Sequence, residues 1–177
     1  RNRAQLFYTI YDGNDWSFPQ PVDTDNTWDE APDAFVIEDK ILVTWADAHR
    51  TFTEADDAKT TLQAMNISGK WFNPEDGTFG AEFAITRQTE IDEKFADLNP
   101  LISYDPDTQR LMVYFTKIDY EDTPRDYDNT PINDPSTVKN TTDDGENTTL
   151  YGDIVNGYNV IAFRWAQKQG DGSFLWN

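Results

Sequence analysis

A repeated hairpin constrains the fold of this chain more than any other feature of its sequence. Residues 29–32 (Asp-Glu-Ala-Pro) lead into one pair of apolar runs, and residues 97–100 (Asp-Leu-Asn-Pro) lead into another. A tight turn divides each pair, at residues 38–40 and 105–107. The runs are rich in β-branched and aromatic residues, and continuous apolar runs fit strands that are buried on both faces. We therefore expect two similar β-hairpins in an all-β chain.

A further strand pair extends this repeat. Three apolar runs begin at residues 6, 62 and 158. Each is expected to be followed by a glycine turn and then by a strand that contains a tryptophan, at Trp16, Trp71 and Trp176; the turn of the second run is expected at residues 68–70. A period of roughly 40–60 residues that holds four short strands is typical of a β-propeller blade. The sequence thus predicts a partial β-propeller over residues 1–177, with consecutive four-stranded blades. Its expected parts are the end of one blade (6–22), one whole blade (32–87) and a further blade (100–176). A complete β-sandwich is the alternative architecture.

Three connecting segments carry less regular patterns. Residues 53–65 are expected to be a loop that runs into a strand, with a short helix capped by Thr53 as the alternative. Residues 85–99 have a helical turn near 91–96 as their minor alternative. Residues 119–152 are rich in Asp, Asn, Thr and Pro, and we expect a polar insertion that forms a long solvated loop. A lid or partner-binding loop is the second interpretation of this insertion.

Composition excludes several classes of function. The formal net charge is −19, which disfavours nucleic acid and anionic membranes as partners because both would be repelled. The absence of Cys excludes disulfides and thiolate metal sites, and the single His49 excludes His-rich sites. No apolar stretch approaches the ~18–20 residues of a membrane span, so no membrane insertion is expected. Because the chain opens with Arg1 and not Met, we expect a fragment of a longer protein.

Residues 9–16 and the phrase Trp-Ser-Phe-Pro at 16–19 resemble sialidase-like β-propellers, which carry Asp-box repeats. The Asp-box is Ser/Thr-x-Asp-x-Gly-x-x-Trp on a hairpin turn. The residues that match it are Thr9, Gly13 and Trp16. Tyr11 stands where the Asp belongs, and Asp12 follows one place late. The resemblance implies a secreted or cell-surface protein, and hence an extracellular or cell-surface location.

No catalytic residue carries over from that family. Its enzymes use three arginines to hold a carboxylate, and no arginine here stands in the Arg-Ile-Pro phrase that marks the first of them. We therefore expect a non-catalytic propeller segment of a larger protein, with a binding or scaffold role. The alternative is part of a sialidase-like glycoside hydrolase that acts on glycans. The expected partners are the remainder of the parent chain or a swapped copy at open blade edges, and a glycan is a further candidate.

Two candidate ligand sites lie in one expected loop. Asp23, Asp25 and Asp29 place three carboxylates within seven residues, and calcium takes oxygen ligands of this kind. The alternative is ordinary turn aspartates. Trp28 lies between these acids, so it is the aromatic residue expected to contact a ligand, whereas the other tryptophans are expected in packing. His49 is expected to be an exposed loop residue, and no cofactor other than calcium is expected.

Overall fold

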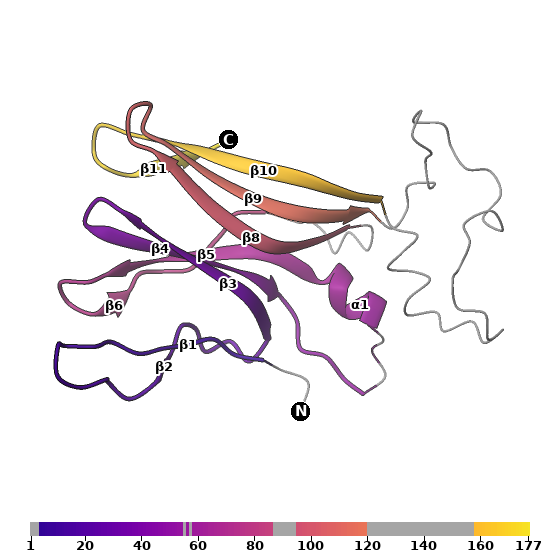
Figure 1. Ribbon diagram of the computed structural model, residues 1–177. Coiled ribbons are helices and arrows are strands. Elements are labelled where there is room, and N and C mark those ends of the chain that lie inside the picture. Colours follow the sequence, from indigo (N-terminus) through magenta and orange to yellow (C-terminus); the bar gives the residue numbers. More distant parts are fainter. Residues whose placement is uncertain (1–3, 55, 57, 87–94, 120–157) are drawn as a thin grey trace, which may run out of the picture.

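The computed structural model describes residues 4–54, 56, 58–86, 95–119 and 158–177, and the regular structure in this part of the chain is β-strand apart from one short helix (Figure 1). The expectation of an all-β chain is confirmed. The elements are β1 (Phe7–Tyr8), β2 (Gln20–Pro21), β3 (Trp28–Ile37), β4 (Lys40–Ala48), α1 (Ala58–Gln63), β5 (Met65–Asn73), β6 (Thr78–Phe79), β7 (Phe83–Ala84), β8 (Phe95–Asp105), β9 (Arg110–Asp119), β10 (Tyr158–Lys168) and β11 (Phe174–Trp176). No helix in the described ranges is both long and apolar enough to cross a lipid bilayer.

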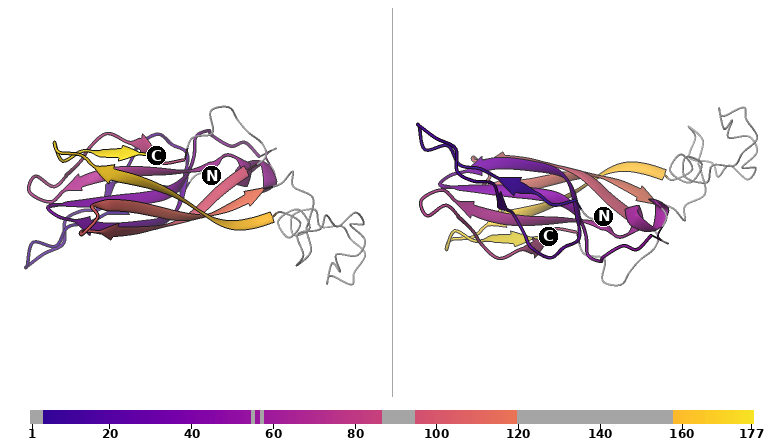
Figure 2. Two further views of the ribbon diagram at one scale, coloured as in Figure 1. Left: turned by 90° about the horizontal axis from the view of Figure 1, so that it is seen from above. Right: turned by 90° about the horizontal axis from the view of Figure 1, so that it is seen from below.

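Two antiparallel meanders build most of the molecule. Strands β3, β4, β5 and β6 are neighbours in chain order, and β7 pairs with β5 beside β6. Strands β8, β9, β10 and β11 form a second sheet with the same sequential order. Figure 1 shows the second meander stacked on the first, with the separate β1–β2 hairpin on the other side of the first. Figure 2 shows the same stack from above and below, and no sheet of the described residues closes on itself.

The first hairpin of each meander contains the same irregularity. The register shifts between Glu30 and Asp33 in β3–β4, and between Leu98 and Leu101 in β8–β9. Ala31 (φ 49°) and Asn99 (φ 51°) take left-handed conformations at these places, each directly before a proline. A bulge suits proline because the unpaired residues do not need a ladder N–H. The Asp-x-x-Pro phrase is therefore the sequence mark of a bulge in both hairpins.

The third strands keep the same register in the two meanders. Trp71 of β5 lies opposite Leu42 of β4, and Trp165 of β10 lies opposite Met112 of β9. These pairs occupy matching places, so Trp71 and Trp165 are equivalent positions. The sequence interpretation that placed Trp71 after a glycine turn, in a fourth strand, is wrong.

Gly69 lies inside β5 and not in a turn, which corrects the expected turn at residues 68–70. A Cβ at Gly69 would lie 3.1 Å from Ile85 Cδ1 and 3.2 Å from Phe83 Cζ. Because Gly69 has no side chain, Phe83 of β7 and Ile85, which follows β7, can pack closely against β5. The turn that follows β5 is at residues 74–77 instead.

The last hairpin of each meander turns on an aspartate. Asp76 Oδ1 accepts hydrogen bonds from the N–H of Thr78 (3.0 Å) and from its hydroxyl (2.6 Å). Asp171 Oδ1 accepts the same two bonds from Ser173, at 3.0 and 2.6 Å. A glycine with positive φ follows each aspartate, at 69° and 84°. These turns are local, because the side chain satisfies backbone donors two residues along.

The core lies between the two meanders. The first meander contributes Ile37, Leu42, Ala46, Ile67 and Ile85, and the second contributes Ile102, Leu111, Val113, Phe115 and Ala166. At the open ends of the strands, Trp71 stacks on Phe174 with ring centroids 5.4 Å apart. Trp45 is fully buried on the opposite face of the first meander, where the Lys70 ammonium lies 5.7 Å from its ring centre.

Among the described residues, nothing covers the other face of the second meander. Exposed apolar side chains on this face are Leu101, Ile161, Phe163 and Leu175, with Met112, Tyr114 and Trp165 half-buried among them. We call these seven residues the outer face. Ile161 lies opposite Thr116 just as Ile67 lies opposite Ala46, so Ile161 and Ile67 are equivalent. Ile67 is 0% exposed beneath the second meander, whereas Ile161 is 74% exposed.

The β1–β2 hairpin carries the segment that resembles an Asp-box. Asp12 Oδ1 accepts hydrogen bonds from the N–H groups of Asn14 (2.8 Å) and Asp15 (2.9 Å), and Gly13 has φ 102°. Tyr11 and Trp16 pair across the turn. Asp12 therefore bridges the turn from the position one place later than the Asp-box pattern assigns.

Of the three connecting segments, only residues 53–65 lie mostly within the described part of the chain. The loop expected at residues 53–65 is wrong in part, because α1 occupies 58–63; the short helix that was the alternative is present, although it begins well after Thr53. The helical turn considered near 91–96 lies mostly outside the described residues, and Phe95 begins a strand. The polar insertion at 119–152 lies outside them beyond Asp119.

Candidate functional site

The three aspartates expected to bind calcium lie together. Asp23 and Asp25 come from the loop between β2 and β3, and Asp29 is the second residue of β3. Each offers a carboxylate oxygen within 4.8 Å of those of the other two. We call these three residues the acidic centre. Asp23 is 6% exposed and Asp29 is 2% exposed, whereas Asp25 lies at the surface.

Local hydrogen bonds shape the loop around the acidic centre. Asp25 Oδ1 accepts a hydrogen bond from the backbone N–H of Thr27 at 2.9 Å, which folds the loop into an Asx turn. The Thr27 hydroxyl lies 2.7 Å from Asp25 Oδ1 and 3.1 Å from Asp47 Oδ1, so it can donate to either. Gln5 Nε2 donates to the carbonyl of Asp23, and the Lys70 ammonium donates to the carbonyl of Val22. The loop is thus fixed by its backbone and by the outer oxygen of Asp25.

The inner carboxylates have no such partners. Neither oxygen of Asp23 or Asp29 accepts a hydrogen bond from an N–H or O–H of the described residues. The backbone N–H of Asp25 lies near Asp23 and lowers the pKa of that carboxyl, but it does not reach hydrogen-bonding geometry. A buried carboxylate without a donor is costly, so these four oxygens call for a proton or a cation.

Burial and mutual repulsion set the protonation of this centre. Burial raises the pKa of Asp29 to about 8, and the charges of Asp23, Asp47 and Asp25 add to the effect. Burial also raises the pKa of Asp23, followed by the charge of Asp25, while Lys70 acts against the shift. Without a cation, the two inner carboxyls therefore hold a proton between them near neutral pH.

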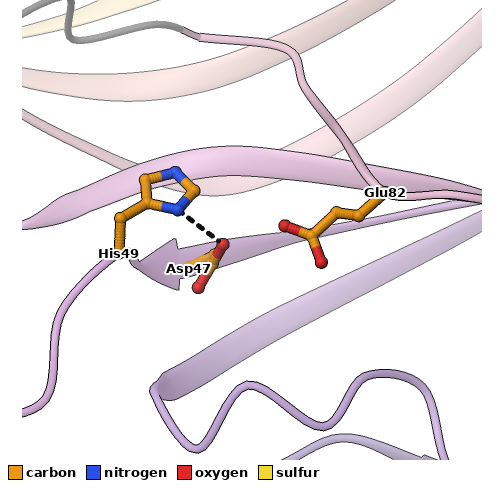
Figure 3. A group of neighbouring side chains, drawn as sticks. All are labelled: Asp47, His49 and Glu82. Atoms are coloured by element: carbon orange, nitrogen blue, oxygen red, sulfur yellow. Dashed lines mark ion pairs between the residues drawn. The ribbon is translucent and has the colours of Figure 1, made fainter.

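A second group of titratable side chains, Asp47, His49 and Glu82, is drawn in Figure 3, and its Asp47 adjoins the acidic centre. Asp47 of β4 lies opposite Asp29 of β3, and His49 Nδ1 is 3.1 Å from Asp47 Oδ2. Glu82, between β6 and β7, lies on the other side of Asp47, and the three residues offer ligand atoms within 4.8 Å of one another. The Lys70 ammonium is 3.4 Å from Glu82 Oε2.

The contacts of Asp47 are those of a structural acid. Ser68 Oγ donates to Asp47 Oδ2 at 2.9 Å, and His49 Nδ1 lies 3.1 Å from the same oxygen as an ion-pair partner. Burial raises the pKa of Asp47, while His49 and Ser68 act against this shift. Ser68 is fully buried and its hydroxyl bonds Asp47, so the trio lacks the accessible serine beside an imidazole that acyl transfer needs. His49 itself is 44% exposed, as expected for a loop residue.

Trp28 begins β3 directly before Asp29. Its indole N–H donates to Glu30 Oε2 at 3.2 Å, and the side chain is half-buried. Its role as a ligand contact stays a prediction.

A cleft of about 1180 Å³ opens between the meanders, and Glu82 belongs both to its lining and to the group with Asp47 and His49. Aromatic walls come from Trp71, Phe83, Phe174 and Trp176, and Glu82 and Arg164 supply charge. Trp176 and Phe83 lie in contact, with ring centroids 6.0 Å apart. This cleft was not predicted from the sequence, because its walls come from strands about 90 residues apart that the stacking of the two sheets brings together.

Comparison with known proteins gives no further assignment. No protein-family model, curated protein or solved structure matches the chain.

Proposed function

We propose that the chain is a non-catalytic scaffold module made of consecutive blades of a β-propeller, and that its outer face packs against a further sheet. The observation that carries this proposal is the unequal burial of equivalent positions. Ile67 and Ile161 hold the same place in the two meanders, yet the second meander covers only the first of them. The outer face therefore has the composition of a buried surface, and no described part of the chain covers it.

The size and pattern of the outer face support a sheet as its cover. In the first meander, Leu42, Ala46 and Ile67 pack against a four-stranded antiparallel sheet. The equivalent places in the second meander hold Met112, Thr116 and Ile161, which continue the same stripe. Contiguous exposed apolar side chains of this kind mark interaction surfaces.

The same feature disfavours the β-sandwich alternative. In a two-layer sandwich each sheet buries one face, and its strands alternate apolar residues inward with polar residues outward. Along β10, Ile161 and Phe163 point outward while Ala162 and Ala166 point inward, so both faces are apolar. A stack that continues beyond two layers fits this pattern better.

The partner in this proposal is a sheet of the same construction from the remainder of a parent chain, or a swapped copy. An extracellular or cell-surface protein remains the setting implied by the resemblance to Asp-box propellers. A sialidase-like glycoside hydrolase is the alternative parent, with its reacting groups supplied by other blades.

The exposed surface can be tested with an apolar dye. The Phe163→Glu variant should lose most of the fluorescence enhancement that the wild-type chain gives with anilinonaphthalene sulfonate. Val36→Glu is the matched control, because Val36 is a similarly exposed strand residue on the first meander. Circular dichroism of both variants checks that the fold is intact. If the two variants bind the dye as strongly as the wild-type chain, the outer face is not an accessible apolar surface and the proposal fails.

A second candidate function is glycan binding in the cleft. Aromatic rings beside charged groups favour it, because the apolar faces of sugar rings stack on such rings while their hydroxyls need polar partners. Trp176→Ala should then abolish binding on a glycan array while the fold stays intact. Equal binding by Trp176→Ala, or no binding by the wild-type chain, would exclude the cleft as a glycan site.

A further inference from the structure

We propose that one calcium ion binds at the acidic centre, with the carboxylates of Asp23, Asp25 and Asp29 as its protein ligands. This inference goes beyond the scaffold proposal and does not depend on it. It stands on two independent features of the site, which are the convergence of the three carboxylates and the unpartnered state of the two that are buried.

The spacing of the ligands fits calcium. Calcium binds oxygen at about 2.3–2.6 Å, so two ligands on opposite sides of the ion lie roughly 5 Å apart. The three carboxylates offer oxygens that all lie within 4.8 Å of one another. Calcium takes about 6–8 oxygens, which three carboxylates can supply in part as bidentate ligands, with water completing the shell on the exposed side of Asp25.

Burial explains why a cation belongs there. Asp23 and Asp29 are at least nine-tenths buried, and their four oxygens have no donor among the described side chains and backbone groups. The nearest ammonium, that of Lys70, is directed to the Val22 carbonyl and to Glu82. A divalent ion would compensate the inner charges in a way that no neighbouring residue does.

The donor set distinguishes calcium from other metals. All three ligands are carboxylates, which hard cations prefer, whereas zinc favours imidazole and thiolate. The adjacent group of Asp47, His49 and Glu82 contains an imidazole, so it is where zinc would compete. Magnesium keeps most of its water and needs a near-octahedral shell at shorter distances, which a largely buried centre does not provide.

Isothermal titration of the chelator-treated chain with calcium chloride at pH 8 tests the inference. We expect one ion per chain and a higher thermal midpoint when calcium is bound. Asp29→Asn should weaken binding at least tenfold. Asp97→Asn is the matched control, because Asp97 holds the equivalent place in the second meander and is equally buried, but belongs to no such cluster.

Three outcomes would overturn the inference. They are no calcium binding by the wild-type chain at pH 8, equal calcium binding by Asp29→Asn and the wild-type chain, and tighter binding of magnesium than of calcium. If Asp29→Asn does not fold, the exposed Asp25→Asn variant replaces it, and the same tenfold loss is expected.

Discussion

Truncation of two equivalent isoleucines should have very different effects on stability. Ile67 is completely buried between the meanders, whereas Ile161 is 74% exposed on the outer face. Truncation of a buried isoleucine to alanine removes its transfer free energy and leaves a cavity, at a cost of about 2–5 kcal/mol. Both substitutions lose the same strand preference, which costs up to about 1 kcal/mol. Ile67→Ala should therefore cost at least ~1 kcal/mol more than Ile161→Ala.

Urea unfolding at fixed pH and fixed calcium concentration measures this difference. At about 2–4 °C per kcal/mol for a chain of this size, the Ile67→Ala midpoint should also fall clearly below that of Ile161→Ala in a thermal scan. Equal losses of stability would show that the two positions have equal burial. The stacking of the second meander on the first would then be wrong.

Two further predictions concern the site and β5. In the calcium-free chain, folded Asp29 keeps a proton that the unfolded chain releases above about pH 4, because its pKa is raised to about 8. The free energy of unfolding in urea should therefore fall as the pH rises from ~4 to ~8, by up to about 1 kcal/mol per pH unit. Asp29→Asn should flatten this pH dependence. A wild-type free energy of unfolding that rises over this range would contradict the raised pKa of Asp29. Gly69→Ala should lower the free energy of unfolding by about 1–3 kcal/mol, because the new methyl group would press on Ile85 and Phe83. Unchanged unfolding of that variant would mean that β7 is not packed over β5.

The hairpins could be predicted from the sequence because their signals are local. Apolar runs bounded by turn residues specify the β3–β4 and β8–β9 pairs directly. The bulge before each proline could not be predicted with the same ease, since it depends on which residues of the partner strand are skipped. Ser68-Gly69-Lys70 was misinterpreted as a turn because glycine in a strand and glycine in a turn have the same local pattern. Only the approach of Phe83 and Ile85 distinguishes them.

Part of the acidic centre could also be predicted from the sequence, because part of its signal is local. Asp23, Asp25 and Asp29 are close in sequence, so their spacing alone brings three carboxylates together. Asp47 was missed, because it lies at the end of an apolar run and reaches the site only through the pairing of β3 with β4. The burial of Asp29 also depends on the pairing of β3 with β4. Without the pairing register, a buried aspartate in an Asp-x-x-Pro phrase cannot be distinguished from an ordinary turn residue.

The central claim is that the two meanders are copies of one structural unit, and that the outer face packs against a further sheet of the same construction. An extended chain in which residues 80–177 are repeated after Asn177 would supply this further sheet. The repeated part contains β8–β11 and the preceding segment with β7. The measurement is the cost of Ile161→Ala, made in the first copy of this extended chain. Our account predicts that the cost rises from below about 1 kcal/mol to the ~2–5 kcal/mol of a buried isoleucine. A cost that stays at the value of the original chain would show that the outer face does not receive a sheet, and would contradict the account.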